Sequence, residues 1–150
     1  MRTGDLAPDF TLPAWTKDGA ADLTLSQHRG GPVVLAFYPG DDTAVCTKQL
    51  CSYQDDLSVL TDLGAVLWGI SAQDVASHEQ FATRRGLRFP LLADTDKRVH
   101  GLYGAKGLMG LPKRAVVVVD AEGVVAFHHA SQVGLTYTDT DAIAAVLTTL

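Results

Sequence analysis

The chain has 150 residues, of which 47% are hydrophobic and 19% charged, and its formal net charge is -5. This composition predicts one globular domain over residues 1–150 and excludes a disordered chain, which would contain fewer apolar and more charged residues. An acidic chain without a long apolar run is expected to bind neither nucleic acid nor membrane. The first residues show no apolar segment typical of a secretory signal, so we expect a cytoplasmic protein.

The first half of the chain predicts a strand–helix–strand unit. Two short apolar pieces are typical of edge strands: residues 10–12 and 23–25. The continuous apolar run 32–38 predicts a strand buried on both faces. Thr43 is a suitable cap for a helix whose apolar residues recur at helical spacing until Gly64 ends the pattern. Residues 65–70 then predict a strand parallel to 32–38.

The second half predicts two longer helices, a short helix and a hairpin. The expected elements are, in order, a helix over 77–85, an extended piece over 89–92, a short helix over 96–103, paired strands over 115–119 and 124–128, and a helix over 140–150. The glycine-rich segment 101–112 predicts a plain mobile loop, because it lacks the Lys-Ser/Thr ending of a phosphate-binding loop. Together these elements predict an α/β fold, a mixed β-sheet flanked by helices.

Two cysteines, Cys46 and Cys51, stand five residues apart. A structural disulfide is not expected in a cytoplasmic chain, and a zinc site would require further ligands at Cys-x-x-Cys spacing. Catalytic thiols, redox-sensing thiols and two small buried residues remain as interpretations. The isolated histidines His28, His78 and His100 show no ligand pattern, so we expect them at the surface or in packing contacts.

Cys46 falls in the first turn of the predicted helix, directly after a buried strand. Backbone N–H groups without helical partners and the positive end of the helix dipole favour a thiolate at such a position. Open α/β sheets also place their functional sites at the carboxyl ends of strands. The sequence therefore predicts a reactive thiol at Cys46, with a merely buried cysteine as the alternative.

The residues around Cys46 resemble those of a known family. Pro39, Thr43 and Cys46 reproduce the Pro-x-x-x-Thr-x-x-Cys motif of the peroxiredoxins, thiol peroxidases with a thioredoxin-like fold. Cys51 stands where the Q-type, or bacterioferritin-comigratory-protein, branch has its resolving cysteine, and Arg114 matches the family's active-site arginine. The likeness extends to further segments: residues 4–12, 34–39, 69–71 and 89–94.

The resemblance implies a peroxidase that reduces hydrogen peroxide and small alkyl hydroperoxides without metal, flavin or haem. Cys46 would become a sulfenic acid, Cys51 would resolve it to a disulfide, and a thioredoxin-like protein would reduce that disulfide. Arg114, the Thr43 hydroxyl and the Cys46 N–H would polarise the O–O bond, while Pro39 would shape and shield the pocket. The resemblance leaves open whether the protein is a monomer or a homodimer.

Two alternatives stay open beside this interpretation. A redox-regulated binding module would use the same thiols as a switch with little turnover, and a one-cysteine peroxidase would leave Cys51 inert. Gln49 departs from the glutamate common in the branch, which bears on helix contacts or on partner preference. In an ideal helix the Cα atoms of Cys46 and Cys51 stand about 8.6 Å apart, beyond the ~7 Å that a disulfide tolerates, so their bonding predicts local unwinding.

Overall fold

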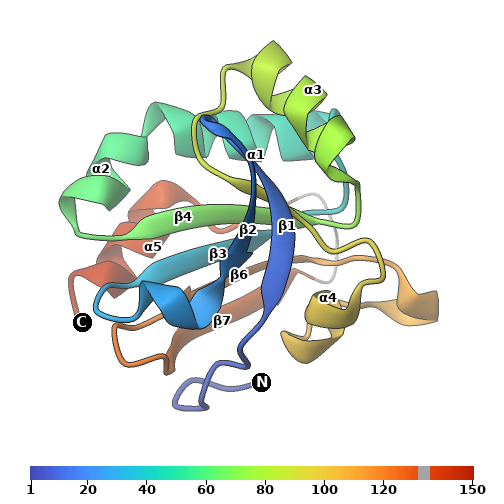
Figure 1. Ribbon diagram of the computed structural model, residues 1–150. Coiled ribbons are helices and arrows are strands. Elements are labelled where there is room, and N and C mark those ends of the chain that lie inside the picture. Colours follow the sequence, from blue (N-terminus) through green and yellow to red (C-terminus); the bar gives the residue numbers. More distant parts are fainter. Residues whose placement is uncertain (132–135) are drawn as a thin grey trace.

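The computed structural model describes residues 1–131 and 136–150, and in this part of the chain the strands form one mixed sheet in the order β2-β1-β5-β4-β3-β6-β7 (Figure 1). The strands are β1 (Thr11–Thr16), β2 (Gly19–Thr24), β3 (Val33–Phe37), β4 (Val66–Ser71), β5 (Leu91–Ala93), β6 (Arg114–Val119) and β7 (Val125–Ser131). The α-helices are α1 (Ala44–Asp55), α2 (Leu57–Asp62), α3 (Val75–Arg85), α4 (Arg98–Leu102) and α5 (Thr140–Leu147). Two short 3-10 helices, η1 (Leu25–His28) and η2 (Leu108–Gly110), complete the elements. The predicted mixed sheet flanked by helices is confirmed.

The strand β3 lies inside the sheet, as its apolar sequence predicts. It pairs in parallel with β4 on one side and antiparallel with β6 on the other, and all of its residues are buried. A strand with neighbours on both edges and helices on both faces has no polar side to present to water. The predicted strand–helix–strand unit is thus confirmed, with α1 and α2 forming the connection.

Successive side chains of the central strands point to opposite faces of the sheet, and each face has its own buried cluster. Val33, Leu35 and Phe37 of β3 belong to the cluster that includes Val99 of α4. The alternate residues belong to the other cluster, with side chains from α1, α2, α3 and α5: Val34, Ala36, Tyr38, Cys46, Leu50, Leu60, Phe81 and Ile143. Cys46 therefore lies on the face of the sheet that four helices cover.

The single helix expected after Thr43 is wrong, because the chain bends at Asp56 and forms two helices. Asp56 has φ -103° and ψ 13°, outside the helical range, although its N–H still bonds to the Ser52 carbonyl at 3.2 Å. Leu60 of α2 packs in the same buried cluster as Leu50 of α1. The bend therefore keeps both helices against the sheet while the apolar spacing in the sequence continues unbroken.

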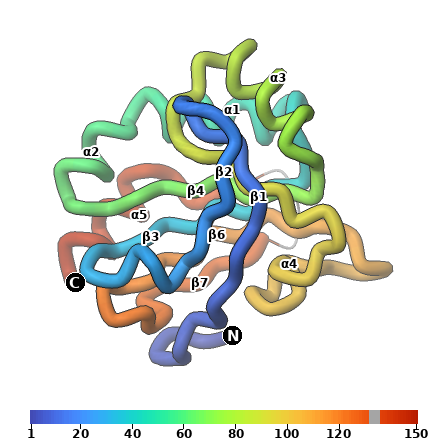
Figure 2. The backbone as a smooth tube through the Cα atoms, viewed as in Figure 1, coloured from blue at the N-terminus to red at the C-terminus, as the bar shows by residue number. Residues whose placement is uncertain are grey.

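The mobile loop expected over residues 101–112 is also wrong in part, because most of this segment is folded. Gly101 belongs to α4, and Lys106 and Pro112 form an antiparallel bridge. The Gly107 N–H bonds to the Leu111 carbonyl at 2.7 Å and closes the tip around η2. Figure 2 shows this segment projecting from the body of the molecule between α4 and β6. Its glycines serve a tight turn rather than an unstructured connection.

Candidate active site

The topology brings Cys46 and Arg114 to the same end of the sheet. The chain leaves β3 after Phe37 and enters α1 at Ala44, so Cys46 lies beyond the carboxyl end of β3. Because β6 runs antiparallel to β3 with Ala115 opposite Phe37, Arg114 begins its strand at that same end. Arg114 has the parity of Val116, which places its side chain on the face covered by α1.

The Cys46 thiol is fully buried and lies against a cation. The Nη2 group of Arg114 donates to the Cys46 Sγ atom across 3.3 Å, and the Arg114 side chain is itself buried. The first intrahelical bond of α1 runs from the Thr47 N–H to the Thr43 carbonyl at 2.8 Å, so the Cys46 N–H precedes it at the amino end of the helix dipole. The Arg114 cation and the amino end of the helix dipole therefore face the place where an oxygen held beside the sulfur would lie.

Gln49, one turn after Cys46, is part of the site. Its side chain is fully buried, and its Oε1 accepts a hydrogen bond from Nη1 of Arg114. Its Nε2 group donates to the Tyr53 hydroxyl at 2.9 Å, and that hydroxyl donates to the Thr138 carbonyl at 2.5 Å. This chain of bonds fixes the plane of the guanidinium. Sequence reasoning noted Gln49 as a departure but did not place it on Arg114; its spacing of three residues from Cys46 was the available signal.

Thr43 is the N-cap residue of α1, but its hydroxyl does not cap the helix. The expected side-chain cap is wrong, because the hydroxyl donates to the Gly40 carbonyl at 3.1 Å and so closes the loop before the helix. The Thr43 residue is exposed and Pro39 is half-buried, so both lie where the site meets solvent. A Cβ atom on Gly40 would lie 2.9 Å from Nε2 of Gln73, which shows how closely this loop is packed.

Cys51 lies on the same helix but in a different environment. Both cysteines are free, and α1 is continuous through them. Burial raises the pKa of the half-buried Cys51 thiol, and the Asp55 carboxylate raises it further, while Arg85 acts in the opposite direction. Cys51 therefore remains a thiol in the folded, reduced state, and it packs at the border of the buried cluster that contains Cys46.

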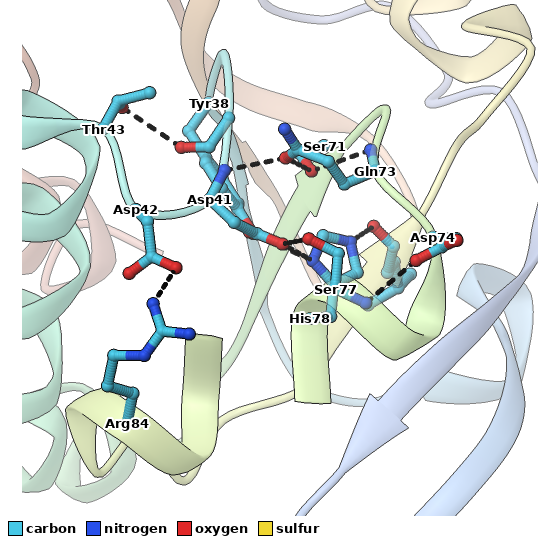
Figure 3. Close-up of polar contacts among 12 residues, drawn as sticks. Tyr38, Asp41, Asp42, Thr43, Ser71, Gln73, Asp74, Ser77, His78 and Arg84 are labelled. Atoms are coloured by element: carbon cyan, nitrogen blue, oxygen red, sulfur yellow. Dashed lines mark hydrogen bonds and ion pairs between the residues drawn. The ribbon is translucent and has the colours of Figure 1, made fainter. Parts of the chain in front are cut away.

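Asp41, in the loop between Pro39 and Thr43, is held by buried polar groups that sequence reasoning missed (Figure 3). His78 Nδ1 lies 2.8 Å from Asp41 Oδ2, and the hydroxyls of Tyr38 and Ser77 each donate to the same carboxylate at 2.7 Å. His78 was expected at the surface or in packing, and it is buried in packing with this ion pair in addition. Burial alone raises the pKa of Asp41, but the hydrogen bond and charge of His78, together with the hydrogen bonds from Tyr38 and Ser77, leave the pKa below its ordinary value.

Two features bear on the expected partners. In the residues that the structure describes, no helix is both long and apolar enough to cross a membrane. Within the same residues, no three side chains of His, Cys, Asp or Glu come together as they would around a metal ion.

Comparison with known proteins gives consistent likenesses. The model of the AhpC/TSA family matches residues 3–128. The chain is 41% identical over 131 residues to a chloroplastic peroxiredoxin Q of Oryza sativa subsp. japonica, which covers 86% of this chain. It spans only 59% of the length of that relative.

Solved structures extend the likeness to the whole fold. The peroxidoxin BcpB of Mycobacterium tuberculosis superposes with a TM-score of 0.88 at 34% identity, covering all of this chain and 98% of its own. The bacterioferritin comigratory protein of Xanthomonas campestris superposes with a TM-score of 0.81 at 25% identity, covering 93% of this chain and 90% of its own. The thioredoxin-like α/β fold expected from the resemblance is thereby confirmed.

Proposed function

Because the chain belongs to the AhpC/TSA family and to the Q-type branch of the peroxiredoxins, we propose that it is a thiol-dependent peroxidase for hydrogen peroxide and small alkyl hydroperoxides. The observation that carries the proposal is the Arg114 guanidinium 3.3 Å from the buried Cys46 sulfur at the start of a helix. The bacterioferritin comigratory protein of Xanthomonas campestris has an alkyl peroxide reduction activity, which supports the substrate class proposed for this chain.

In the first step the Cys46 thiolate attacks one oxygen of the hydroperoxide. The S–O bond forms as the O–O bond breaks, Cys46 becomes a sulfenic acid, and the departing oxygen leaves as water or an alcohol after taking a proton. Negative charge develops on the departing oxygen, and Arg114 and the Cys46 N–H stabilise it. The Thr43 hydroxyl joins them by exchanging its hydrogen bond to the Gly40 carbonyl for one to that oxygen. Pro39 offers no N–H and has a fixed φ, so its part is to shape the pocket and exclude water.

In the second step the Cys51 thiol attacks the sulfenic sulfur, a Cys46–Cys51 disulfide forms, and water leaves. A dithiol protein of the thioredoxin type then reduces the disulfide and is itself oxidised, which returns both thiols. The half-buried position of Cys51 supports this order, because the thiol lies near the surface on the helix that must open. The assignment of Cys51 as the resolving residue is part of the proposal.

The remaining features of the proposal concern the setting of the protein. We propose that residues 1–150 act as one domain, that the protein works as an antioxidant in the cytoplasm, and that it needs no cofactor. The absence of a suitable membrane-spanning helix among the described residues is compatible with that compartment, whereas the rice relative is chloroplastic.

The decisive experiment follows the oxidation of Cys46 in rapid-mixing measurements with hydrogen peroxide and an alkyl hydroperoxide. The proposal expects a rate far above that of a free cysteine, and it expects many turnovers when a thioredoxin system is added. In Cys51→Ser the sulfenic acid should persist and be trapped by a sulfenate reagent with mass spectrometry. Oxidation of Cys46 at the rate of a free thiol would eliminate the peroxidase, and efficient turnover of Cys51→Ser would eliminate Cys51 as resolver.

A further inference from the structure

A buried ion pair anchors the loop in front of α1, and the steps proposed above do not use it (Figure 3). The side chains of His78 and Asp41 are 0% and 4% exposed, and they meet at 2.8 Å. Asp41 stands two residues after Pro39 and two before Thr43, the loop residues that the proposed function places at the peroxide. A buried pair at this position fixes where both of those residues lie.

The hydrogen bonds of His78 require a proton on each ring nitrogen. Nδ1 faces the Asp41 carboxylate, and Nε2 lies 3.0 Å from the Leu92 carbonyl oxygen. A carbonyl oxygen has no proton to donate. The Tyr38 hydroxyl lies 3.4 Å from Nδ1 but donates its proton to Asp41 at 2.7 Å, so both ring nitrogens act as donors. His78 is therefore an imidazolium whose charge the Asp41 carboxylate balances inside the protein. Removing either partner leaves a buried charge without its counterion.

The backbone of the loop is anchored at the same place. The Asp41 N–H donates to Oε1 of Gln73 at 2.7 Å, and the Ser71 hydroxyl donates to that oxygen at 3.0 Å. The Asp41 main chain is thus tied to the segment that joins β4 to α3, while its side chain is tied to α3 itself. The loop cannot shift without breaking both sets of bonds.

The anchored loop also adjoins the reacting sulfur. Tyr38, which donates to Asp41 Oδ1, packs in the same buried cluster as Cys46. Burial raises the pKa of Tyr38 well above its ordinary value, the Asp41 charge adds to this, and the charge of Cys46 acts in the same direction. Tyr38 therefore stays protonated and donates its hydroxyl proton to Asp41. Through Tyr38, the ion pair contacts the buried cluster that contains the Cys46 thiol.

We propose that Asp41 and His78 are positioning residues for peroxide reduction, because their buried ion pair holds the loop from Pro39 to Thr43 in its place beside Cys46. This inference rests on the proposed function. The pair does not touch the peroxide or the sulfur. It acts by keeping the loop where the departing oxygen develops its charge, and misplacement of such groups by about 1 Å lowers a rate by up to about a hundredfold.

The test compares Asp41→Asn, His78→Gln and the double variant in a Cys51→Ser background, where Cys46 is the sole thiol. Asp42→Asn is the matched control: Asp42 is the next residue of the same loop, its pair with Arg84 lies at the surface, and asparagine accepts its φ of 61°. Two rate constants are measured for each protein, the oxidation of Cys46 by hydrogen peroxide and its alkylation by iodoacetamide. Alkylation reports access and thiolate content but involves no O–O bond.

Each single variant at Asp41 or His78 is expected to lose between about tenfold and a hundredfold in peroxide oxidation, with alkylation changed by less than about threefold. The double variant should lose no more than the worse single variant, because the two residues act as one unit. Peroxide rates equal to that of Asp42→Asn, or parallel losses in both reactions, would overturn the inference. A parent chain that oxidises no faster than free cysteine would instead eliminate the proposed function.

A measurement on the unsubstituted protein tests the ion pair directly, even if the variants unfold. The ¹⁵N chemical shifts of histidine rings distinguish a ring with two N–H groups from a neutral one. His100 is the internal control: its Nδ1 lies 2.6 Å from Asp94 Oδ2, but its buried Nε2 has no hydrogen-bond partner among the described residues. We expect two N–H groups on His78 and one on His100 in the reduced protein. A neutral His78 ring would overturn the ion pair and with it the inference.

Discussion

Arg114 brings a permanent charge and a planar set of N–H donors to the Cys46 sulfur, and it is oriented by its bond to Gln49. A free thiol with a pKa of ~8.5 is about 3% ionised at pH 7, so loss of thiolate alone lowers a rate by at most about 30-fold. We expect Arg114→Ala to slow peroxide oxidation by more than about 30-fold, because the variant also loses stabilisation of the departing oxygen.

The measurement is the rate of Cys46 oxidation by hydrogen peroxide as a function of pH, in the parent chain and in Arg114→Ala. Lys113→Ala serves as the matched control, because Lys113 is the neighbouring cation and its side chain lies beside Gly107, in the segment before β6. The control should keep the parent rate within about threefold, because the contact of Arg114 with the Cys46 sulfur stays in place. A loss in Arg114→Ala that stays within about 30-fold at pH 7 would contradict the polarisation argument.

A second residue-scale prediction concerns Gly69, in β4. A Cβ atom there would lie 2.7 Å from Cδ2 of Leu91 and 3.3 Å from Cε1 of Tyr38, in a fully packed interior. Gly69→Ala is therefore expected to lower the free energy of unfolding by about 1–3 kcal/mol through overpacking. Gly101→Ala is the control, since Gly101 lies in α4 with only Lys106 nearby at 3.9 Å. Urea unfolding that ranks the two variants equally would rule out this account.

The residues of the site differ in how far a sequence can reveal them. Cys46 and Arg114 were predictable, because a strand end, a helix start and a family motif can all be recognised in a short stretch of sequence. Gln49 and the pair of Asp41 with His78 were not placed, because their contacts depend on how α1 and α3 dock on the sheet. Buried polar partners 37 residues apart leave no periodic signal in a single sequence.

At the scale of the elements, α1 has to satisfy two requirements that conflict. In the proposed reaction it must be intact to present the Cys46 N–H and sulfur to the peroxide, and it is continuous through Cys51 while both cysteines are free. An ideal helix holds the two Cα atoms about 8.6 Å apart, whereas a disulfide requires less than ~7 Å. We therefore expect the first turns of α1 to unwind when the Cys46–Cys51 disulfide forms.

Amide hydrogen exchange of the reduced and the disulfide forms measures this unwinding directly. Amides in the first turns of α1 should lose protection on oxidation, while amides of β3 and β6, in the middle of the sheet, should keep theirs. Peroxide-treated Cys51→Ser controls for the effect of sulfenic acid alone, and its α1 should remain protected. A disulfide form with unchanged exchange throughout α1 would show that the bond forms without unwinding.

The elements themselves were largely predictable, and the two errors have physical reasons. The order of strands and helices follows from apolar runs and glycine stops, as at Gly86, which ends α3 in the left-handed conformation. The bend at Asp56 was missed, because apolar spacing records which side faces the core but not whether the helix axis stays straight. The folded tip over 106–112 was missed, because it is closed by backbone hydrogen bonds. Such bonds involve no particular side chain, so a glycine-rich sequence does not reveal whether they form.

At the scale of the whole molecule, buried ionisable groups on both faces of the sheet set the pH range of stability. Burial raises the pKa values of Tyr38, Tyr53 and Tyr103 above the ordinary value near 10. Asp41 and Asp94 have lowered pKa values: burial alone would raise them, but hydrogen bonds from His78 and His100 outweigh it. The carboxylates contribute stability above a pH of ~3.9, which is lost as the pH falls through their folded pKa values.

The tyrosines give the more specific prediction, on the alkaline side. A raised folded pKa contributes stability that is complete below pH ~10 and is lost as the pH rises toward the folded value, because the unfolded chain releases its protons first. Each tyrosine then lowers the free energy of unfolding by about 1.4 kcal/mol per pH unit, and three together by about 4. Tyr103→Phe removes one such group far from Cys46, together with its hydrogen bond to the Pro8 carbonyl. Urea unfolding between about pH 9 and 12 should show the alkaline slope reduced by about one third in this variant, apart from a constant offset for the lost bond. An unchanged slope would mean that Tyr103 ionises as readily in the folded protein as in the unfolded chain.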